Sequence, residues 1–397
     1  MPIGGDVVRI DRVTQSRVEI GLHETFRTAI RETDSIAAIR IEIHAEGRVG
    51  VGYATATPAI TGDTVERIET FLGDVVAPYL VGRDLVSRHP YVLGAQSNAL
   101  FGIPHRDYEG WTLQCSSATA GVDLALHDLV FHSPPTSPSS FGSPGLDSSD
   151  FSDTSQAGLV TSVTIGAGSV EDMVATAHRR VAAGFRVIKA KLGADPEHDA
   201  QRLIALAQTI GAVGEAWGSE QRLVHLWVDA NQGWTVAQAL EIFDAALDAG
   251  VVLGVFEQPT QAGDIVGLRE VREGVRQRCV ARGVEVVPVV ADESARTLAD
   301  VDRIIEAGAA DVINVKFMKF GGITGSGVAV KKAREAGLGV LVGSMMEHPH
   351  SVAAAVRFAS SLGGVHDLDA GWWAKDTSPL RYADGIVSVT RSAFERG

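Results

Sequence analysis

The sequence predicts an α/β barrel of parallel strands preceded by a small α+β domain. From Val160 onward, short apolar segments alternate with helical segments, and eight of the apolar segments have the character of strands. Eight strands alternating with helices are typical of a (β/α)8, or TIM-type, barrel. Before about residue 125, strand patterns come first and helical patterns follow. A doubly wound sheet is the weaker alternative, because no GxGxxG follows a first strand and eight units exceed its usual number.

The N-terminal segment begins with strand patterns over residues 6–13 and 36–44. In the second, Ile39, Ile41 and Ile43 share one face of the strand and polar residues share the other. Residues 47–52 predict a turn into a further strand, and helical spacing follows from about Thr64 to Val130. We therefore expect an α+β capping domain over residues 1–125.

The segment 132–157 interrupts these patterns. It is rich in Ser, Pro, Gly and Asp, which predicts a long surface loop because it lacks the apolar residues needed to order itself. The barrel is expected over residues 126–370, with this loop near its start. Residues 371–397 form no further βα unit and are expected to pack back on the capping domain and complete it.

The predicted barrel strands share a short apolar stretch, and most end in polar residues. They are Leu159–Ile165, Arg186–Lys191, Val224–Asp229, Val252–Glu257, Val286–Asp292, Asp311–Lys316, Gly339–Val342 and Val365–Asp369. The segments between several of these strands have the spacing of amphipathic helices. They are Val170–Ala183, Asp199–Val213, Val236–Ala249, Leu298–Ala307 and Gly325–Ala336.

Composition excludes several classes of partner. The chain of 397 residues carries a net charge of −14, which disfavours nucleic acid and anionic membrane surfaces. Two cysteines far apart in sequence form no disulfide framework and fit the reducing cytoplasm. The N-terminus lacks a signal-peptide pattern, and no apolar run of about 18 residues predicts a transmembrane helix. A cytoplasmic enzyme is the expectation.

Charged residues end successive predicted strands. In chain order they are Lys189 with Lys191, Asp229, Glu257, Asp292 and Lys316, and Asp367 and Asp369 end the last strand. In a barrel all these ends surround one mouth. Helix caps and salt bridges to the lysines are the structural alternative for such residues. Five successive strand ends with this charge pattern favour a functional site.

Three of these ends predict a metal site. Asp229, Glu257 and Asp292 come from neighbouring strands, and like charges in a shared site require a cation or protons. Carboxylate oxygens suit Mg²⁺. Lysines on both sides of these carboxylates suit removal of a proton beside a substrate carboxylate and its return to the other face. Because Lys189 and Lys191 share a strand face, repulsion between them favours a neutral amine.

The same residues resemble the motifs of the enolase superfamily, and the lysine on each side resembles its muconate-lactonizing subgroup. The resemblance implies that Lys191 and Lys316 are the acid/base groups and that Lys189 tunes Lys191. It also implies Mg²⁺ as cofactor, held by the three carboxylates, with Asn231 and Glu293 around them. The segments that carry it are Lys189–Lys191, Asp229–Trp234, Glu257–Pro259, Asp292–Ser294 and Lys316–Ile323.

Further segments are similar to the dipeptide epimerases, the L-Ala-D/L-Glu epimerase type. They are Thr28–Arg31, Ala59–Asp63 and Asp367–Asp369. The resemblance implies that Asp367 and Asp369 bind the α-ammonium of a dipeptide substrate. Two carboxylates two residues apart on a strand point the same way, which suits a group with several donors. The resemblance to the dipeptide epimerases further implies that four more residues contact the substrate: Arg31, Ile60, Ser344 and Met345.

Other reactions of the same lysine pair remain open: N-acylamino-acid racemase, o-succinylbenzoate synthase or muconate cycloisomerase activity. A binding protein without turnover is a third hypothesis, but no ligand or base is missing. The sequence departs from the family in loop 132–157 and in an extra stretch around Arg276–Val287, which are both expected to be surface insertions. It also departs at Glu347, His348 and His350, whose roles are open. A symmetric homo-oligomer is expected, as is usual for capped barrels.

Overall fold

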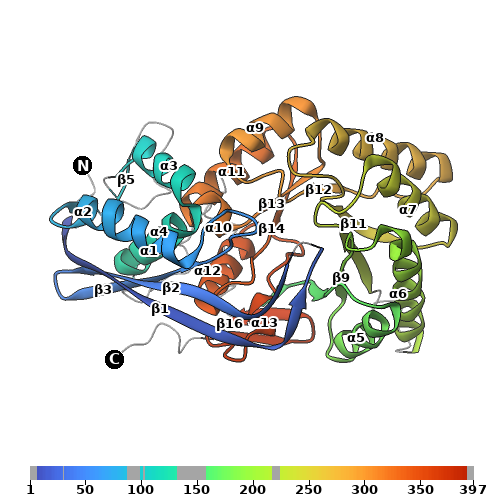
Figure 1. Cartoon of the computed structure of the whole chain (residues 1–397), viewed down its shortest axis with the longest axis horizontal. Helices are drawn as coiled ribbons and strands as arrows, with labels where there is room; N and C mark the ends of the chain where they lie inside the picture. Colours follow the sequence, from blue (N-terminus) through green and yellow to red (C-terminus); the bar gives the residue numbers. More distant parts are fainter. Residues whose placement is uncertain are drawn as a thin grey trace.

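The computed structural model describes residues 7–29, 31–86, 99–101, 103–131, 158–216 and 224–390. A four-stranded antiparallel sheet in the order β3-β2-β1-β4 lies at one end of the molecule, and a seven-stranded parallel sheet forms the centre of the other part (Figure 1). The predicted surface loop 132–157 lies outside the described residues.

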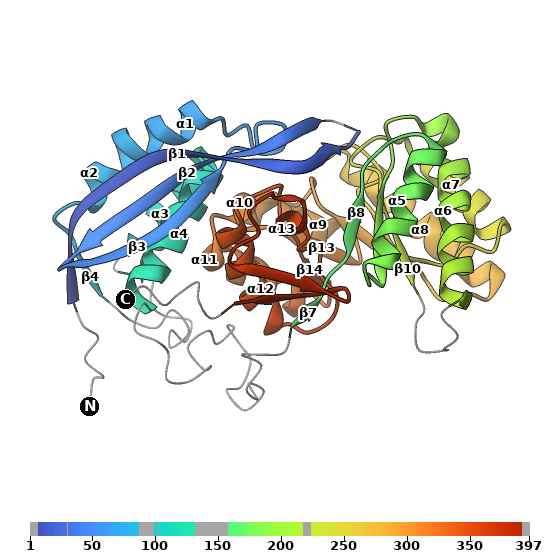
Figure 2. The same ribbon diagram turned by 90° about the horizontal axis from the view of Figure 1, so that it is seen from below.

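The N-terminal strands are longer than their sequence patterns predict. Strand β1 extends far beyond residue 13 and pairs with β2 in a hairpin that reaches over the barrel (Figure 2). Its outer part has one partly apolar face, in which Leu22 and Phe26 are buried, but Glu24 between them interrupts the apolar alternation that marks a half-buried strand. The strands of this sheet are β1 Val7–Arg27, β2 Glu32–Ala45, β3 Arg48–Thr55 and β4 Asp84–Val86.

Helices cover one face of this sheet. Ile39, Ile41 and Ile43 are fully buried in the core that β2 shares with these helices, as the alternating pattern predicts. Helix α4 packs directly on β3: a Cβ atom at Gly52 would lie 2.0 Å from the carbonyl oxygen of Gly121. The helices here are α1 Val65–Phe71, the π-helix η1 Leu72–Val76, α2 Ala77–Leu80, α3 His105–Gln114 and α4 Ser116–Phe131, with short strands β5 Ala99–Leu100 and β6 Ile103–Pro104.

The parallel sheet confirms the predicted barrel. Its strands run in the order β14-β13-β12-β11-β10-β9-β8, with each strand beside its sequence neighbour. This order is typical of a barrel wound in one direction. The strands are β8 Val163–Ile165, β9 Val187–Lys191, β10 His225–Asp229, β11 Leu253–Glu257, β12 Val289–Ala291, β13 Val312–Val315 and β14 Gly339–Val342.

The prediction of a regular eighth strand over Val365–Asp369 is wrong. Only single bridges form there, from Asp367 to Gly343 and from His366 to Thr161, and they join β14 to the strand region on the other side. Helix α13 begins directly after Asp369 and turns the chain away from the sheet. The predicted first strand is likewise divided, into β7 Leu159–Val160 and β8.

Two long helices of the barrel, α8 and α12, were not predicted as such, and neither were the four-residue helices α10 and α13. The stretch around Arg276–Val287, expected to be a surface insertion, is largely the second half of α8, which buries Val271, Val275 and Cys279 at intervals of four. Helix α12 follows the seventh strand. The helices are α5 Val170–Ala182, α6 Pro196–Ala216, α7 Val236–Asp248, α8 Ile265–Arg282, α9 Leu298–Ala307, α10 Phe317–Phe320, α11 Ile323–Glu335, α12 Pro349–Ser360 and α13 Ala370–Trp373.

The C-terminal segment contacts both parts of the molecule. Strands β15 Leu380–Ala383 and β16 Ile386–Val389 form a hairpin, and β16 pairs with β7 beside the barrel. The preceding residues bridge to β1, since Ala374 pairs with Leu22. The domain boundaries at residues 125 and 370 stay predictions. Among the helices of the described ranges, none combines the length and the apolar character that crossing a membrane requires.

Candidate active site

The register of the parallel strands places the charged residues at their ends side by side at one edge of the sheet. Lys191 lies opposite Asp229 in the pairing of β9 with β10, and Asp229 lies opposite Glu257 in the pairing of β10 with β11. Asp292 follows β12 directly. Oxygen atoms of the three carboxylates lie within 4.8 Å of one another, and all three residues are buried. The structure therefore brings together the three residues predicted as metal ligands.

This set of donors fits a divalent cation. Three buried carboxylates carry like charges that must be compensated, and hard oxygen donors are the ligands that Mg²⁺ prefers. Burial, with further contributions from Asp229 and Asp292, raises the pKa of Glu257 to about 7. A cation among these three side chains would favour their ionised forms.

Lys189 lies beneath the carboxylates and is fully buried. Its Nζ is 2.7 Å from Asp367 Oδ2, 2.9 Å from Glu257 Oε2 and 3.1 Å from Asp229 Oδ2. Burial lowers the pKa of Lys189, but the carboxylates outweigh burial and hold that pKa well above its usual value. Lys189 is therefore a fixed positive charge in the floor of the site.

Lys191 and Lys316 lie on the two sides of the carboxylates. Lys191 ends β9, and Lys316 directly follows β13. These two strands flank β10, β11 and β12 in the sheet. Lys191 Nζ is 2.6 Å from Asp229 Oδ2, and Lys316 Nζ is 2.6 Å from Asp292 Oδ2. Burial lowers the pKa of Lys316, but the surrounding carboxylates, Asp292 foremost, together outweigh burial and raise that pKa. Each of these lysines thus contacts one carboxylate of the cluster. The structural alternative, in which the lysines only form salt bridges, requires the same contacts.

A pocket of about 40 Å³ lies above this cluster. The charged cluster contributes Lys191, Lys316 and Asp292 to its lining, whereas Lys189, Asp229 and Glu257 lie behind these residues. The pocket is also lined by the other predicted site residues, which are Arg31, Ile60, Asn231, Glu293, Ser344, Met345, Asp367 and Asp369.

Asn231 and Glu293 support the carboxylate cluster. The backbone N–H of Asn231 donates to Asp229 Oδ1 at 2.9 Å, and its side-chain amide donates to Glu293 Oε1 at 3.2 Å. Burial, and then the charge of Asp292, raises the pKa of Glu293 to about 8. A neutral Glu293 adds no further negative charge to the cluster.

Three residues that orient the cluster were missed by the sequence analysis. Lys319 Nζ lies 2.7 Å from Asp292 Oδ1 and 2.6 Å from the carbonyl oxygen of Asn314. The Asn314 amide donates to Glu257 Oε1 at 2.9 Å, and Gln258 Oε1 accepts the backbone N–H of Asp292 at 2.9 Å. Asn314 interrupts an otherwise apolar strand, and this was the signal available in the sequence.

The two aspartates of the last barrel segment are held by neighbours from the first. Ser162 Oγ donates to Asp367 Oδ1 at 2.8 Å, and the backbone N–H of Thr164 donates to Asp369 Oδ2 at 2.7 Å. Burial raises the pKa of Asp367, but Lys189, Lys191 and Lys316 together outweigh burial, and the pKa falls to about 2. Burial and the charge of Asp367 raise the pKa of Asp369. Both residues line the pocket.

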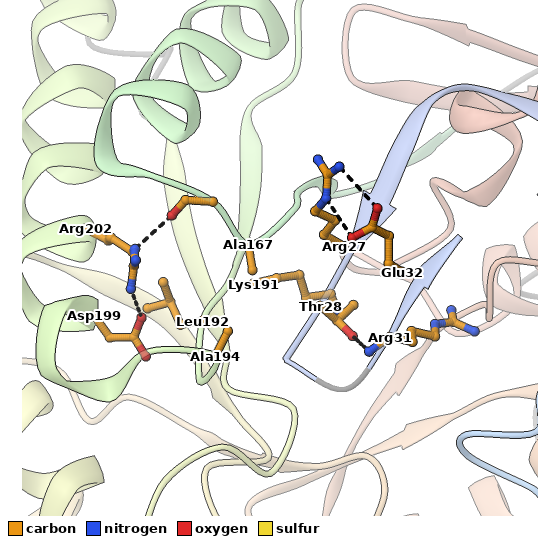
Figure 3. A pocket seen from close by; sticks show the side chains of 11 residues that line it. Arg27, Thr28, Arg31, Glu32, Ala167, Lys191, Leu192, Ala194, Asp199 and Arg202 are labelled. Carbon is orange, nitrogen blue, oxygen red and sulfur yellow. Dashed lines mark hydrogen bonds and ion pairs between the residues drawn. The ribbon is translucent and has the colours of Figure 1, made fainter. Parts of the chain in front are cut away.

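A larger cavity of about 380 Å³ adjoins the pocket beside Lys191 (Figure 3). It lies between the β1–β2 hairpin and the loops after β8 and β9. Arg27 forms a two-bonded ion pair with Glu32, and Arg31 points away from that pair (Figure 3). Burial lowers the pKa of Arg31, and the charges of Glu293 and Asp292 oppose this. Arg31 is thus a cation of the hairpin that lines the smaller pocket and interacts with two of its carboxyl groups.

Residues 347–350 lie at the edge of the site. Glu347 is buried, and its Oε1 accepts the backbone N–H of Met345 at 3.0 Å. Burial raises the pKa of Glu347 to about 8. The ring of His348 stacks on Tyr53 at 3.5 Å between centroids, so this residue packs between β3 and the barrel.

Comparison with known proteins places this site in a family. Residues 11–134 match the N-terminal domain of mandelate racemase / muconate lactonizing enzyme, and residues 172–393 match the enolase C-terminal domain-like family. The L-amino acid-D/L-Glu epimerase of Francisella philomiragia is 31% identical over 382 residues, covering 96% of this chain and 94% of the relative.

Two solved structures share the fold and moderate identity. The substrate-liganded L-Ala-D/L-Glu epimerase from Bacillus subtilis has a TM-score of 0.77 and 27% identity, with 96% of each chain covered. The dipeptide epimerase from Methylococcus capsulatus, complexed with Mg and L-Arg-D-Lys, has a TM-score of 0.76 and 27% identity, with 96% of this chain and 97% of that chain covered. The chain is an isomerase of the epimerase kind and belongs to the mandelate racemase / muconate lactonizing enzyme family of the enolase superfamily.

Proposed function

We propose that the protein is a Mg²⁺-dependent epimerase of dipeptides. The observation that carries the proposal is the arrangement of one pocket: Lys191 and Lys316 line it from strands on opposite sides of the carboxylates, and Asp367 and Asp369 line it as well. The relatives with this function cover nearly the whole chain, which supports the same assignment.

Asp229, Glu257 and Asp292 would hold the cation. Their oxygens lie within 4.8 Å of one another, and Lys189 and Asn314 fix the orientation of two of them. When bound, the cation would supply positive charge to a substrate carboxylate and so lower the cost of removing the adjacent proton. Charged Lys189 adds to this positive potential from below.

The two lysines carry the proton transfer. Lys191 Nζ takes the α-proton from one face of the substrate carbon, and Lys316 Nζ delivers a proton to the other face. For the opposite stereoisomer the two roles are exchanged. Because both lysines reach the same pocket from flanking strands, the substrate carbon needs no rotation between the two steps.

The remaining pocket residues select the substrate. Asp367 and Asp369 would accept hydrogen bonds from the α-ammonium of the dipeptide, which offers three donors. Arg31, Ile60 and Met345 line the same pocket, with Ser344, and would contact the substrate side chain. A guanidinium at Arg31 favours an acidic side chain there.

Solvent exchange tests the proposal. The purified protein with Mg²⁺ is incubated in D₂O with a panel of dipeptides that includes L-Ala-L-Glu, and ¹H NMR follows the α-proton of the C-terminal residue. We expect loss of that signal together with appearance of the L,D stereoisomer. Absence of exchange across the whole panel would refute the assignment.

A further inference from the structure

Trp373 of α13 connects Asp369 to the capping strand β1. The indole N–H of Trp373 donates to Asp369 Oδ2 at 3.0 Å, and the residue is only 3% exposed. The ring of Phe26 meets the Trp373 ring edge-on, at 5.1 Å between centroids and 87° between planes. Phe26 and Asp369 both line the catalytic pocket, whereas Trp373 lies behind them.

Arg180 of α5 contacts the same indole. Its guanidinium lies 5.1 Å from the centre of the Trp373 ring, which is cation–π distance. The same guanidinium donates to Glu24 of β1 and is almost fully buried. The chain after Trp373 also pairs with β1, because the N–H of Lys375 donates to the carbonyl oxygen of Gly21 at 2.9 Å.

These contacts constrain the carboxyl group of Asp369. Its Oδ2 receives two donors, the backbone N–H of Thr164 on the barrel and the indole N–H of Trp373. The backbone donor is fixed by β8. The indole donor is fixed by Phe26 and Arg180, and therefore by the position of β1. The orientation of Asp369 thus depends on contacts between the two parts of the molecule.

We propose that Trp373 is a positioning residue for Asp369, and that through it the seating of strand β1 sets how the site binds the free amino terminus of a dipeptide. The inference rests on the proposed function, in which Asp369 accepts the substrate ammonium. Trp373 itself contacts neither the substrate nor the reacting carbon.

The matched pair Trp373→Phe and Trp372→Phe tests the proposal kinetically. Phenylalanine at 373 retains an aromatic ring for Phe26 and Arg180 but removes the N–H donor. Trp372 packs on Phe185 at 4.9 Å. Its backbone N–H donates to the carbonyl oxygen of Asp369 at 2.8 Å, a bond that Trp372→Phe retains, whereas the indole that donates to the Asp369 carboxyl group belongs to Trp373. For W373F we expect KM for L-Ala-L-Glu to rise about tenfold, the usual effect of one lost bond to a charged group, with kcat nearly unchanged.

An N-acetylated dipeptide separates positioning from general damage. It lacks the ammonium, so W373F should leave its slow exchange rate unchanged, whereas a merely structural defect would reduce both substrates alike. The W372F control should match the parent protein with both substrates. Equal KM values for W373F and the parent protein would overturn the proposal. If W373F does not fold, Arg180→Met is measured in its place. An unchanged KM in R180M would likewise overturn the proposal.

A spectroscopic readout is independent of turnover. In ¹⁵N-labelled protein, the Trp373 indole signal is identified by its absence in W373F, and Asp369→Asn is then expected to shift that signal but not the Trp372 signal. A shift without dipeptide turnover would refute the proposed function and leave the positioning contact established. An unmoved Trp373 signal would overturn the positioning role, whatever the activity.

Discussion

At the scale of single residues, the site is a balanced set of buried charges. Each carboxylate of the proposed metal cluster contacts at least one lysine, and Asp292 contacts both Lys316 and Lys319. Removing one member of a buried pair leaves an uncompensated charge and costs several kcal/mol. The lysines therefore have a structural role as well as the proposed chemical one, and experiments must separate the two.

Replacing Lys316 with Met is expected to reduce epimerisation at least about 100-fold, because one of the two proton-transfer groups is lost. Exchange of the α-proton should persist for the single stereoisomer whose proton faces Lys191. ¹H NMR in D₂O on the L,L and L,D dipeptides separately measures this. Lys331→Met, at an exposed lysine, is the control. Continued exchange of both stereoisomers would contradict the two-lysine assignment.

Replacing Asp369 with Asn is expected to lower kcat/KM for a free dipeptide by about 10- to 100-fold, because one charged acceptor for the ammonium is lost. An N-acyl amino acid has no ammonium and should be affected little. Comparing both substrates by polarimetry distinguishes the dipeptide reaction from N-acylamino-acid racemisation. Similar losses with both substrates would argue against ammonium binding at this residue.

At the scale of elements, short segments after the strands orient the strand-end residues. Helix α10 directly follows β13 and returns Lys319 to the carboxylate of Asp292. The bridges of His366 and Asp367 close the barrel between β14 and the segment around Thr161. The site therefore depends on irregular segments as much as on the strands themselves.

Replacing Lys319 with Met is expected to weaken Mg²⁺ binding by about 10- to 100-fold, because Asp292 loses a partner that orients it. Isothermal titration calorimetry with MgCl₂ measures the affinity without any substrate. Lys332→Met is the control, since Lys332 pairs with Asp302 on the surface. Equal affinities in the two variants would show that Lys319 does not support the cation site.

The buried imidazole of His366 leads us to expect that the unfolding free energy of the protein falls at acidic pH. Burial lowers its pKa from 6.5 to about 4, and its Nδ1 accepts the backbone N–H of Val342 at 3.0 Å. Between pH 6.5 and 4 the unfolded chain binds a proton that the folded chain does not, so the unfolding free energy falls as pH falls. The loss amounts to about 3 kcal/mol and is complete below pH 4.

Asparagine at position 366 retains an acceptor for Val342 but does not titrate. Urea denaturation at several pH values should therefore show a weaker acid dependence for His366→Asn than for the parent protein. His23→Asn, at an exposed position on β1, should leave the dependence as it is. An identical pH dependence in the parent and H366N would contradict the assignment to His366.

At the scale of the whole molecule, the capping domain holds the segment that carries the second lysine. Asp123 of α4 accepts the N–H and the hydroxyl of Thr324, at 3.2 Å and 2.6 Å, at the start of α11. Tyr108 of α3 donates to the carbonyl oxygen of Gly321. Lys316 therefore lies on a segment held from both the barrel and the capping domain.

Gly322 lies at a closely packed point of that joint. Its φ is +99°, and a Cβ atom there would lie 2.4 Å from Asp123 Oδ2. Gly322→Ala should lower the unfolding free energy by about 1–3 kcal/mol and should also reduce kcat. Chemical denaturation and the exchange assay measure the two effects. Gly110→Ala is the control, because Gly110 lies on α3 with open space around it, and this variant should be as stable and active as the parent protein. Equal behaviour of the two variants would contradict the close packing of Gly322 against Asp123.

Much of the site could be predicted because it lies at strand ends. Alternating apolar residues locate a strand, and the charged residue that ends it then falls at the barrel mouth, as for Asp229 and Glu257. Lys319 and Asn314 escaped prediction because their roles depend on which side chain they face, and sequence spacing does not encode that. The outer part of β1 was not predicted because Glu24 interrupts the apolar face that carries the buried Leu22 and Phe26, and because its pairing with β2 is not visible in the sequence pattern.

The reach of the β1–β2 hairpin has a consequence for how such proteins diversify. Its tip carries Thr28 and Arg31 to the pocket from a separate sheet, while the proposed acid/base lysines belong to the barrel. Substitutions at the tip can therefore alter which side chain is accepted without disturbing the groups that move protons. A combinatorial library confined to Thr28, Arg31 and Ile60 would explore new substrates on an unchanged reaction centre.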